Sequence, residues 1–201
     1  MRIAVLGTGS VGQSISAKLR ALGHDVHIGS RTAGDGKHTY ADAAAFAELL
    51  FNCTSGGGSL AALQAAGENA LGDKVLIDVA NPLDFSKGFP PSLLVCNTDS
   101  LAETLQRAFP KVRVVKALNT INNGLMVDPG KLAGGEHDLP LCGNDAAAKE
   151  TVKSLLATFG WKHFVDVGDL TGARAMEMYL PLWVRLYGTL KTADFNFKLM
   201  R

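Results

Sequence analysis

Three glycines near the N-terminus have the types and spacing that could hold a phosphate ester. They form a Gly-x-Gly-x-x-Gly pattern that directly follows an apolar run at residues 2–6 and opens a segment with helical periodicity. In that context the first glycine permits a tight turn, the second lets the backbone approach a diphosphate, and the third lets helix and strand pack closely. Helix N–H groups and the helix dipole then hold the anion. We therefore expect a dinucleotide to bind at Gly7, Thr8, Gly9, Ser10, Val11 and Gly12.

The end of the expected second strand, residues 25–29, is followed by no carboxylate. NAD-specific proteins carry an acidic residue there to bind the ribose hydroxyls, and such a residue would repel a 2′-phosphate. Here Ser30 and Thr32 offer hydroxyl groups, and Arg31 offers a planar cation that suits a phosphate. The sequence thus predicts NADP(H) rather than NAD(H), unless Arg31 is an ordinary solvated loop cation.

Two further candidates for the 2′-phosphate lie on the loop that follows, Lys37 and His38. The sequence alone does not place that loop relative to the second strand.

No side chain stands out as an obligatory proton donor, although a dehydrogenase of alcohols or carbonyls needs one. Lys116 could point toward the pocket, or it could be a strand lysine with its head at a solvated edge. Hydride exchange with a flat ring needs little proton handling, because proximity and the two cofactors supply most of the chemistry. The glycine-rich segment 55–58 could form a wall for such a ring, or it could be a flexible connection. The catalytic residues are therefore unknown from the sequence.

The elements that must position these residues alternate between β-rich runs and helical segments, which predicts an α/β fold. We expect a Rossmann-type, doubly wound, mainly parallel sheet in residues 1–168, which bind NADP, and a C-terminal helical segment in residues 169–201. The expected strands are 2–6, 25–29, 49–53, 74–79, 112–118, 139–142 and 164–167. The expected helices are 10–22, 40–48, one through Leu60 and Leu63, 100–108, 146–159 and a long one from about Thr171.

Apolar residues of the C-terminal helix cover more than the single stripe that packing on one sheet face needs. They are Ala175, Met176, Met178, Leu180, Leu182, Trp183, Leu186 and Tyr187. Pro181 should bend this segment. We expect a homodimer built partly on this helix, with Phe195 and Phe197 closing over the acceptor pocket. The alternative is that the helix folds back and both faces are covered within one chain.

Charge and composition exclude several classes of protein. The chain has 20 Lys and Arg against 19 Asp and Glu, so it lacks the excess of positive charge that binding to nucleic acid or to an anionic membrane would require. Its apolar runs are too short to span a bilayer. The 3 cysteines lie far apart, which suits a reducing compartment better than a disulfide framework or a metal site. We expect a cytoplasmic protein without a metal.

Five segments together resemble the family of coenzyme F420-dependent NADP oxidoreductases, which includes the cytosolic reductase domain of some membrane metalloreductases. They are residues 1–12, 29–31, 78–82, 115–120 and 195–199, so the resemblance spans nearly the whole chain. Asp-Val-Ala-Asn-Pro at 78–82 and Val-Lys-Ala-Leu-Asn-Thr at 115–120 are its more specific part.

The resemblance implies that residues 8–11 hold the pyrophosphate and that Ser30 and Arg31 hold the 2′-phosphate. It also implies that Asn81, Ala117 and Asn119 border the nicotinamide. Both of these last segments end expected strands, where ligands of parallel sheets bind. Thr54 ends the third strand and should pass along the dinucleotide too. The chain departs from the family at residues 52–58, and Leu118 replaces the family's phenylalanine.

The function expected from these features is hydride transfer between NADPH and a ring-shaped acceptor, either the deazaflavin F420 or a flavin. One alternative is an NADPH-dependent reductase of a small carbonyl or imine. Another is a non-catalytic NADPH-binding sensor module. Asn81 and Asn119 favour catalysis, because a sensor of the adenine half would not need polar residues at the nicotinamide end.

Overall fold

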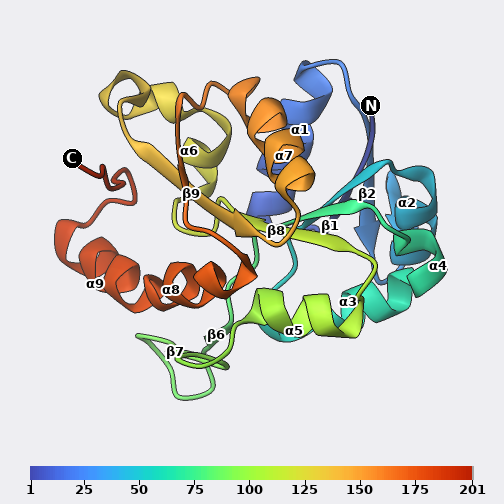
Figure 1. The fold of residues 1–201 in the computed structure, drawn as a ribbon, viewed down its shortest axis with the longest axis horizontal. Helices are drawn as coiled ribbons and strands as arrows, with labels where there is room; N and C mark the ends of the chain where they lie inside the picture. Colours follow the sequence, from blue (N-terminus) through green and yellow to red (C-terminus); the bar gives the residue numbers. More distant parts are fainter. Residues whose placement is uncertain (201) are drawn as a thin grey trace.

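Eight strands form one sheet with helices on both of its faces, in a computed structural model that describes residues 1–200 (Figure 1). The strand order is β10-β9-β8-β5-β4-β1-β2-β3. The six parallel strands, in their order across the sheet, are β8, β5, β4, β1, β2 and β3, which is the doubly wound order. β9 is antiparallel to β8, and β10 is parallel to β9. The predicted Rossmann-type, mainly parallel fold is therefore confirmed.

The bounds of most elements lie within a few residues of those expected. The strands are β1 (Arg2–Leu6), β2 (Asp25–Ser30), β3 (Lys37–Thr39), β4 (Leu49–Asn52), β5 (Val75–Asp78), β6 (Leu83–Asp84), β7 (Ser92–Leu93), β8 (Arg113–Ala117), β9 (Asp138–Gly143) and β10 (His163–Asp166). The helices are α1 (Ser10–Ala21), α2 (Tyr40–Phe46), α3 (Gly56–Ala66), α4 (Glu68–Leu71), α5 (Leu101–Ala108), α6 (Asn123–Val127), α7 (Ala146–Ala157), α8 (Ala173–Met178) and α9 (Leu180–Leu190).

The sheet has a separate hydrophobic core on each face, because successive side chains of a strand point to opposite sides. Ile3 and Val5 of β1 pack in one core with residues of α1, α6 and α7. Ala4 and Leu6 pack in the other core with residues of α2, α3, α5 and α8. Figure 1 shows α1, α6 and α7 on one side of the sheet and α3, α5 and α8 on the other. Both faces are thus covered, and the ends of the strands are left for ligands.

Side chains cap the N-termini of four α-helices, and α1 and α3, which begin at the ends of β1 and β4, are among the five described α-helices without a side-chain cap. Thr39, Ser100, Asn122 and Asp145 accept hydrogen bonds from backbone N–H groups in the first turns of α2, α5, α6 and α7. Gly9 and Ser55, which precede α1 and α3, make no such bond. The first N–H groups of α1 and α3 are therefore open to another acceptor.

The structure adds several elements that the sequence did not indicate. β3 overlaps the loop expected after the second strand and pairs with β2. β6 and β7 form a small antiparallel hairpin, and α6 follows β8. β3, β6 and β7 are only two or three residues long, so periodicity gives no signal for them.

The expected long C-terminal helix is divided at Tyr179 into α8 and α9, and Tyr179 keeps helical backbone angles. Pro181 lies in the first turn of α9 and lacks an N–H, so it cannot donate the helical hydrogen bond expected there. Figure 1 shows α9 turning away from the direction of α8, as the sequence predicted. Ala173 and Met176 of α8 pack in the second core, so α8 is fastened to the body of the domain.

Within residues 1–200, no helix has the length and apolar character needed to cross a membrane.

Candidate functional site

A continuous groove follows the carboxyl ends of the parallel strands. It consists of a first cavity of about 840 Å³, which borders Gly7, Thr8 and Gly9, and a second cavity of about 520 Å³, which borders Asn81 and Asn119. Three consecutive residues, Cys53, Thr54 and Ser55, line both cavities and so join them. The groove lies where the strand order reverses between β1 and β4, which is where doubly wound sheets bind ligands.

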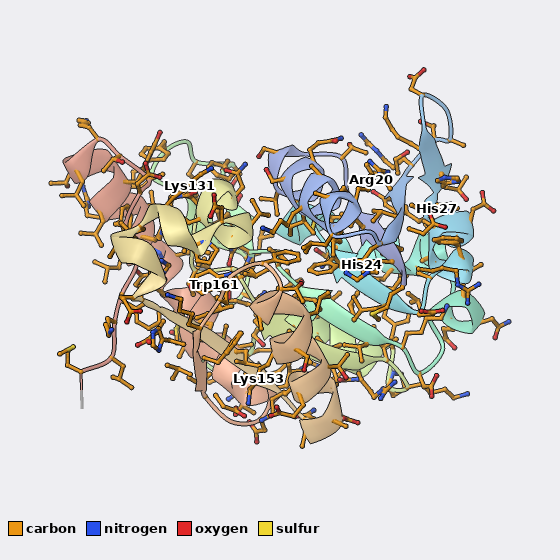
Figure 2. The ribbon with its side chains drawn as sticks, turned by 90° about the horizontal axis from the view of Figure 1, so that it is seen from above. Arg20, His24, His27, Lys131, Lys153 and Trp161 are labelled. Atoms are coloured by element: carbon orange, nitrogen blue, oxygen red, sulfur yellow. The ribbon has the colours of Figure 1, made fainter. Side chains whose placement is uncertain are left out.

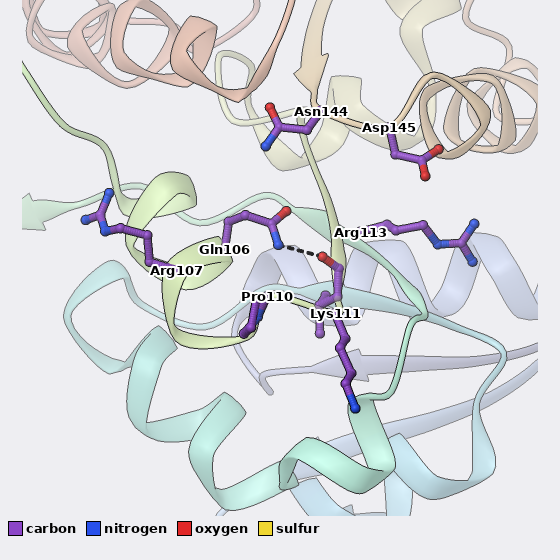
Figure 3. A pocket seen from close by; sticks show the side chains of 8 residues that line it. Gln106, Arg107, Pro110, Lys111, Arg113, Asn144 and Asp145 are labelled. Atoms are coloured by element: carbon purple, nitrogen blue, oxygen red, sulfur yellow. Dashed lines mark hydrogen bonds between the residues drawn. The ribbon is translucent and has the colours of Figure 1, made fainter.

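A separate cavity of about 500 Å³ lies at the opposite ends of the strands from the groove, where β8 begins (Figure 3). Gln106 lines it and donates a 2.7 Å hydrogen bond to the carbonyl oxygen of Val112, just before β8 begins. None of the residues predicted to bind the dinucleotide lines this separate cavity.

The three glycines of the loop differ in what surrounds them. Gly7 has a φ of +123°, and a Cβ there would lie 2.5 Å from the carbonyl oxygen of Cys53. A Cβ on Gly12 would lie 2.3 Å from the carbonyl oxygen of Gly7. A Cβ on Gly9 would meet no atom within 4 Å. Gly7 and Gly12 are thus required by the packing of the protein itself, whereas Gly9 leaves free space beside the groove.

Hydroxyl groups and cations gather at the end of the first cavity beyond β2. Ser30, Arg31 and Thr32 line it, and the pairing of β3 with β2 adds Lys37 and Thr39. Arg31 is exposed and forms no ion pair within the described chain. No Asp or Glu is among the described residues that line this cavity, so nothing at its surface repels a phosphate.

His38, the other loop candidate, does not line the first cavity. Its ring stacks on His27 at 3.7 Å between centroids, and His27 stacks on Phe46 at 3.6 Å. Burial, together with the nearby His38, lowers the pKa of His27. Figure 2 shows His27 and His24 on the same side of the molecule as Arg20. These histidines therefore pack on the β2 side of the sheet and do not line the groove.

Thr54 lies at the junction of the two cavities and is held by a buried hydrogen-bond network. Its hydroxyl donates to Asn52 Oδ1 at 2.7 Å and lies 2.8 Å from Ser59 Oγ. Asn52 in turn donates to Asp78 Oδ1 at 2.8 Å. Burial, and next the Asp78 carboxylate, raises the pKa of Cys53, so its thiol stays protonated beside this network.

A reciprocal pair of asparagines forms the floor of the second cavity. Asn81 Nδ2 donates to the carbonyl oxygen of Asn119 at 2.9 Å, and Asn119 Nδ2 donates to Asn81 Oδ1 at 3.0 Å. Asn119 Nδ2 also donates to the carbonyl oxygen of Met176 at 3.0 Å. The carboxyl ends of β5 and β8 and the helix α8 are therefore locked together at this point.

The wall opposite the asparagines is apolar and aromatic, and the sequence did not place it. Leu180, Trp183 and Tyr187 of α9 line the second cavity, together with Phe85 from the hairpin. Trp183 stacks on Tyr187 at 5.6 Å between ring centroids. None of the described residues that line this cavity is charged.

The two C-terminal phenylalanines expected over the acceptor lie behind this wall. Phe195 packs against Trp183 at 5.3 Å, and Phe197 meets the ring of Tyr179 edge-on at 5.9 Å. Neither of them lines the second cavity.

Residues 55–58 are not a flexible connection, and Ser55 and Gly56 line part of the second cavity. Gly56, Gly57 and Gly58 are the first turn of α3. A Cβ on Gly56 would lie 2.1 Å from the carbonyl oxygen of Asn81, so glycine allows α3 to begin against the floor of the second cavity. The glycine run therefore reflects close packing.

Most of the predicted binding residues line the groove, and three do not. Ser10 is exposed outside it, and Gly12 is buried against Gly7. Ala117 is fully buried in the core at the end of β8 and lines neither cavity, which corrects the expectation that it borders the nicotinamide. The residues that line the groove are Gly7, Thr8, Gly9, Val11, Ser30, Arg31, Thr32, Thr54, Asn81 and Asn119.

Lys116 has neither of the surroundings expected from the sequence. Its side chain is fully buried, and Nζ lies 2.8 Å from both Asp78 Oδ2 and Glu177 Oε1. Nζ also donates to the carbonyl oxygen of Ala80. Burial opposes the charged form, but the two carboxylates outweigh it and raise the pKa of Lys116. All three ammonium protons thus have acceptors inside the protein, and Lys116 lines neither cavity.

Sequence reasoning missed Glu177, which the structure places behind the second cavity. A signal existed, because Glu177 is an acidic residue within the apolar stretch of residues 175–187. A fully buried carboxylate in such a stretch needs a partner cation, and Lys116 in an apolar strand needs an anion.

Comparison with known families and curated proteins finds a matching family model and curated relatives that are reductases. The family model for NADP oxidoreductase, coenzyme F420-dependent, matches residues 2–82. Metalloreductase STEAP3 of Rattus norvegicus is 29% identical over 198 residues, which cover 90% of this chain and 38% of the relative. The F420-dependent NADP reductase of Methanocaldococcus jannaschii is 28% identical over 114 residues, 56% of this chain and 50% of the relative. The chain spans half or less of the length of these relatives.

Solved structures include one that matches this chain along its whole length. A protein from Arthrobacter sp. FB24, provisionally assigned as an F420-dependent NADP reductase, is 50% identical with a TM-score of 0.96, and the match covers 100% of both chains. The reductive aminase of Aspergillus terreus in complex with NADPH and ethyl levulinate is 18% identical with a TM-score of 0.66 over 94% of this chain and 62% of that one. The second likeness is one of fold alone.

Replacing Gly9 with valine should separate binding from folding. The Cβ of the new side chain would meet no protein atom within 4 Å, but the side chain would occupy the space where a diphosphate approaches the loop. We expect NADPH to bind more than roughly 100-fold more weakly, about 2.8 kcal/mol, in a fluorescence titration. The melting temperature should change little.

Gly12→Val is the matched control. Its Cβ would lie 2.3 Å from the Gly7 carbonyl oxygen, so overpacking should cost about 1–3 kcal/mol of stability. Normal NADPH binding by the Gly9→Val protein would show that the loop is not the site.

Proposed function

The chain belongs to the family of coenzyme F420-dependent NADP oxidoreductases, and on that premise we propose that it transfers hydride between NADPH and a ring-shaped acceptor, a deazaflavin such as F420 or a flavin. It is an NADP-dependent oxidoreductase, and the acceptor is the part that is proposed. The observation that carries the proposal is the uncharged second cavity, which has an amide floor and an aromatic wall.

We assign the parts of NADP(H) to the groove from one end to the other. The 2′-phosphate binds Arg31 with Ser30 and Thr32, and Lys37 adds a second cation. The pyrophosphate lies over residues 7–11, where the N-terminus of α1 has no side-chain cap. The nicotinamide passes Thr54 into the second cavity and lies beside Asn81 and Asn119, with Val11 at the edge of the same cavity.

The acceptor ring stacks between the nicotinamide and the wall that contains Trp183 and Tyr187. When NADPH reacts, the C4–H bond of the dihydronicotinamide breaks, and the hydrogen leaves with both electrons for the acceptor. A proton from water then balances the reduced acceptor. This transfer requires close, parallel rings rather than a protein acid, so its rate depends mainly on how the walls orient the two rings.

A reductase of small carbonyls or imines is the competing function. The only phenol among the described residues that line the second cavity is Tyr187, which would have to act as the acid. Its ring is stacked on Trp183, an arrangement that favours a role in the wall.

Replacing Arg31 with alanine tests the assignment of NADP. Charge-assisted hydrogen bonds to the 2′-phosphate exist only for NADPH, so its affinity should fall by roughly 1.5–3 kcal/mol while that of NADH hardly changes. Isothermal titration with both dinucleotides measures this. Arg113→Ala is the control, because Arg113 begins β8 at the end of the strand away from the groove, and it should leave both affinities unchanged. Equal affinities for NADPH and NADH in the unaltered protein would contradict the assignment.

Oxidation of NADPH, followed at its own absorbance band, identifies the acceptor. We expect turnover with a deazaflavin or flavin and none with small ketones or cyclic imines. Trp183→Ala should lower kcat/KM for the ring acceptor by roughly tenfold through lost stacking, with the NADPH affinity retained. Turnover of imines that is lost in Tyr187→Phe would favour the competing function.

We also propose that the chain forms a homodimer through the outer face of α9, within the C-terminal segment 169–201. Leu182 and Leu190 are 54% and 52% exposed, and neither of them lines the second cavity. Trp183 faces the second cavity and is not a free part of this surface. A helix with one side on its own domain and a second apolar side in water suits a symmetric partner.

Light scattering tests the dimer. We expect twice 21.2 kDa for the unaltered protein and 21.2 kDa after Leu182→Glu with Leu190→Glu, because each buried glutamate would lack a partner. Leu22→Glu, on the 39% exposed leucine after α1, is the control and should leave the mass unchanged. A mass of 21.2 kDa for the unaltered protein would refute the dimer.

A further inference from the structure

Three charged side chains form a fully buried cluster between the sheet and α8. We call Asp78, Lys116 and Glu177 the charge triad; each of them is 0% exposed. Lys116 Nζ lies 2.8 Å from a carboxylate oxygen of each acidic partner, and its third proton goes to the Ala80 carbonyl oxygen. With one cation and two carboxylates, the ionised triad carries one net negative charge.

The hydrogen bonds indicate that both carboxylates are ionised. Glu177 accepts from the backbone N–H groups of Leu101 and Ala102 at 2.8 and 3.3 Å, at the start of α5, as well as from Lys116. Burial raises the pKa of Glu177, and the positive charge of Lys116 limits that rise.

Asp78 has the same kind of surroundings. Its carboxylate accepts from Asn52 Nδ2 at 2.8 Å and from the backbone N–H of Ala80 at 3.3 Å, as well as from Lys116. Each polar contact of the two carboxylates is with a donor, which leaves no acceptor for an acid proton.

The triad lies directly behind the wall of the second cavity. Ala80 accepts from Lys116 and itself lines that cavity, next to Asn81. On the other side, Asn119 of the cavity floor donates to the carbonyl oxygen of Met176, the neighbour of Glu177. Because no described residue lining the cavity is charged, the field of the triad meets no opposing side chain there.

We propose that the net negative charge of the triad stabilises the oxidised nicotinamide ring and so favours the release of hydride from NADPH. This proposal rests on the placement of the nicotinamide in the second cavity under the proposed function. The dihydronicotinamide ring is neutral, and it becomes positively charged when hydride leaves for the acceptor. A fixed, buried negative charge beside the ring lowers the free energy of that product and of the transition state leading to it.

The members of the triad act as positioning residues, since none of them lines the cavity that holds the ring. A merely structural role, tying β5, β8 and α8 together, would affect NADPH and NADP⁺ equally. An electrostatic role would affect the two differently. The ratio of their dissociation constants therefore distinguishes the two roles.

Glu177→Gln removes one negative charge from the triad and keeps the shape of the side chain. We expect NADP⁺ to weaken relative to NADPH by about tenfold, which corresponds to about 30 mV in the potential of the bound two-electron couple. Titration with each dinucleotide measures the ratio. Glu177→Asp keeps the charge and should restore the ratio of the unaltered protein. Glu103→Gln makes the same chemical change in the pair with Arg174, away from the groove, and should leave the ratio unchanged.

Equal loss of both affinities in Glu177→Gln would overturn the proposal. If that variant does not fold, Asp78→Asn makes the same change in net charge and has the same expected result. Titration of the unaltered protein is an independent test. Under the proposal, NADP⁺ should bind the unaltered protein at least as tightly as NADPH does. A tenfold preference for NADPH would also overturn the proposal. Failure of both dinucleotides to bind the unaltered protein would instead refute the proposed function.

Discussion

The ammonium group of Lys116 joins parts of the chain that are far apart in sequence. Burying one cation and two carboxylates is costly, and the cost is recovered only when every proton and lone pair has a partner. Here the three protons of Lys116 have three acceptors, and backbone amides supply the remaining bonds to Glu177. The position of α8 is therefore fixed relative to β5 and β8, and α9, which follows directly, carries the aromatic wall of the second cavity.

The two ends of the groove differ in their physical character. The first cavity is lined by Arg31 and Lys37, whose charges suit an anionic group. The second is lined by amides and aromatic rings, which suit a neutral, flat group. Thr54, at the junction, is bonded through Asn52 to Asp78 of the charge triad, so one buried network reaches both the junction and the floor. Such a division suits a cofactor that is anchored by its phosphates and reacts at a neutral ring.

The sequence predicts those parts of the molecule that depend on neighbours a few residues away. The turn at Gly7, the helix after Gly9 and the absence of a carboxylate after β2 are all local patterns, and the groove contains them where expected. Alternating strands and helices also predict the doubly wound sheet, whose order follows from the short, right-handed connections of such folds.

The parts that could not be predicted depend on distant partners. Lys116 was uncertain because its meaning depends on Asp78 and Glu177, and no local period pairs a strand lysine with a helix that comes much later. Ala117 was misplaced because it is the last residue of β8 and its side chain packs in the core, whereas Asn119, beyond the strand end, lines the second cavity. β3 was missed because three residues form a strand only through their pairing with β2.

The distribution of helix caps links the fold to the site. A missing N-terminal cap costs a helix on the order of 1 kcal/mol, and α2, α5, α6 and α7 avoid that cost with Thr39, Ser100, Asn122 and Asp145. α1 and α3 lack a side-chain cap, as α4, α8 and α9 do, and α1 and α3 are the two of these that begin at the groove at the ends of β1 and β4. A capping side chain there would occupy the backbone N–H groups that an anionic ligand needs. The protein therefore gives up stability at two helix ends that face the groove, and the ligand itself is the group that can satisfy them.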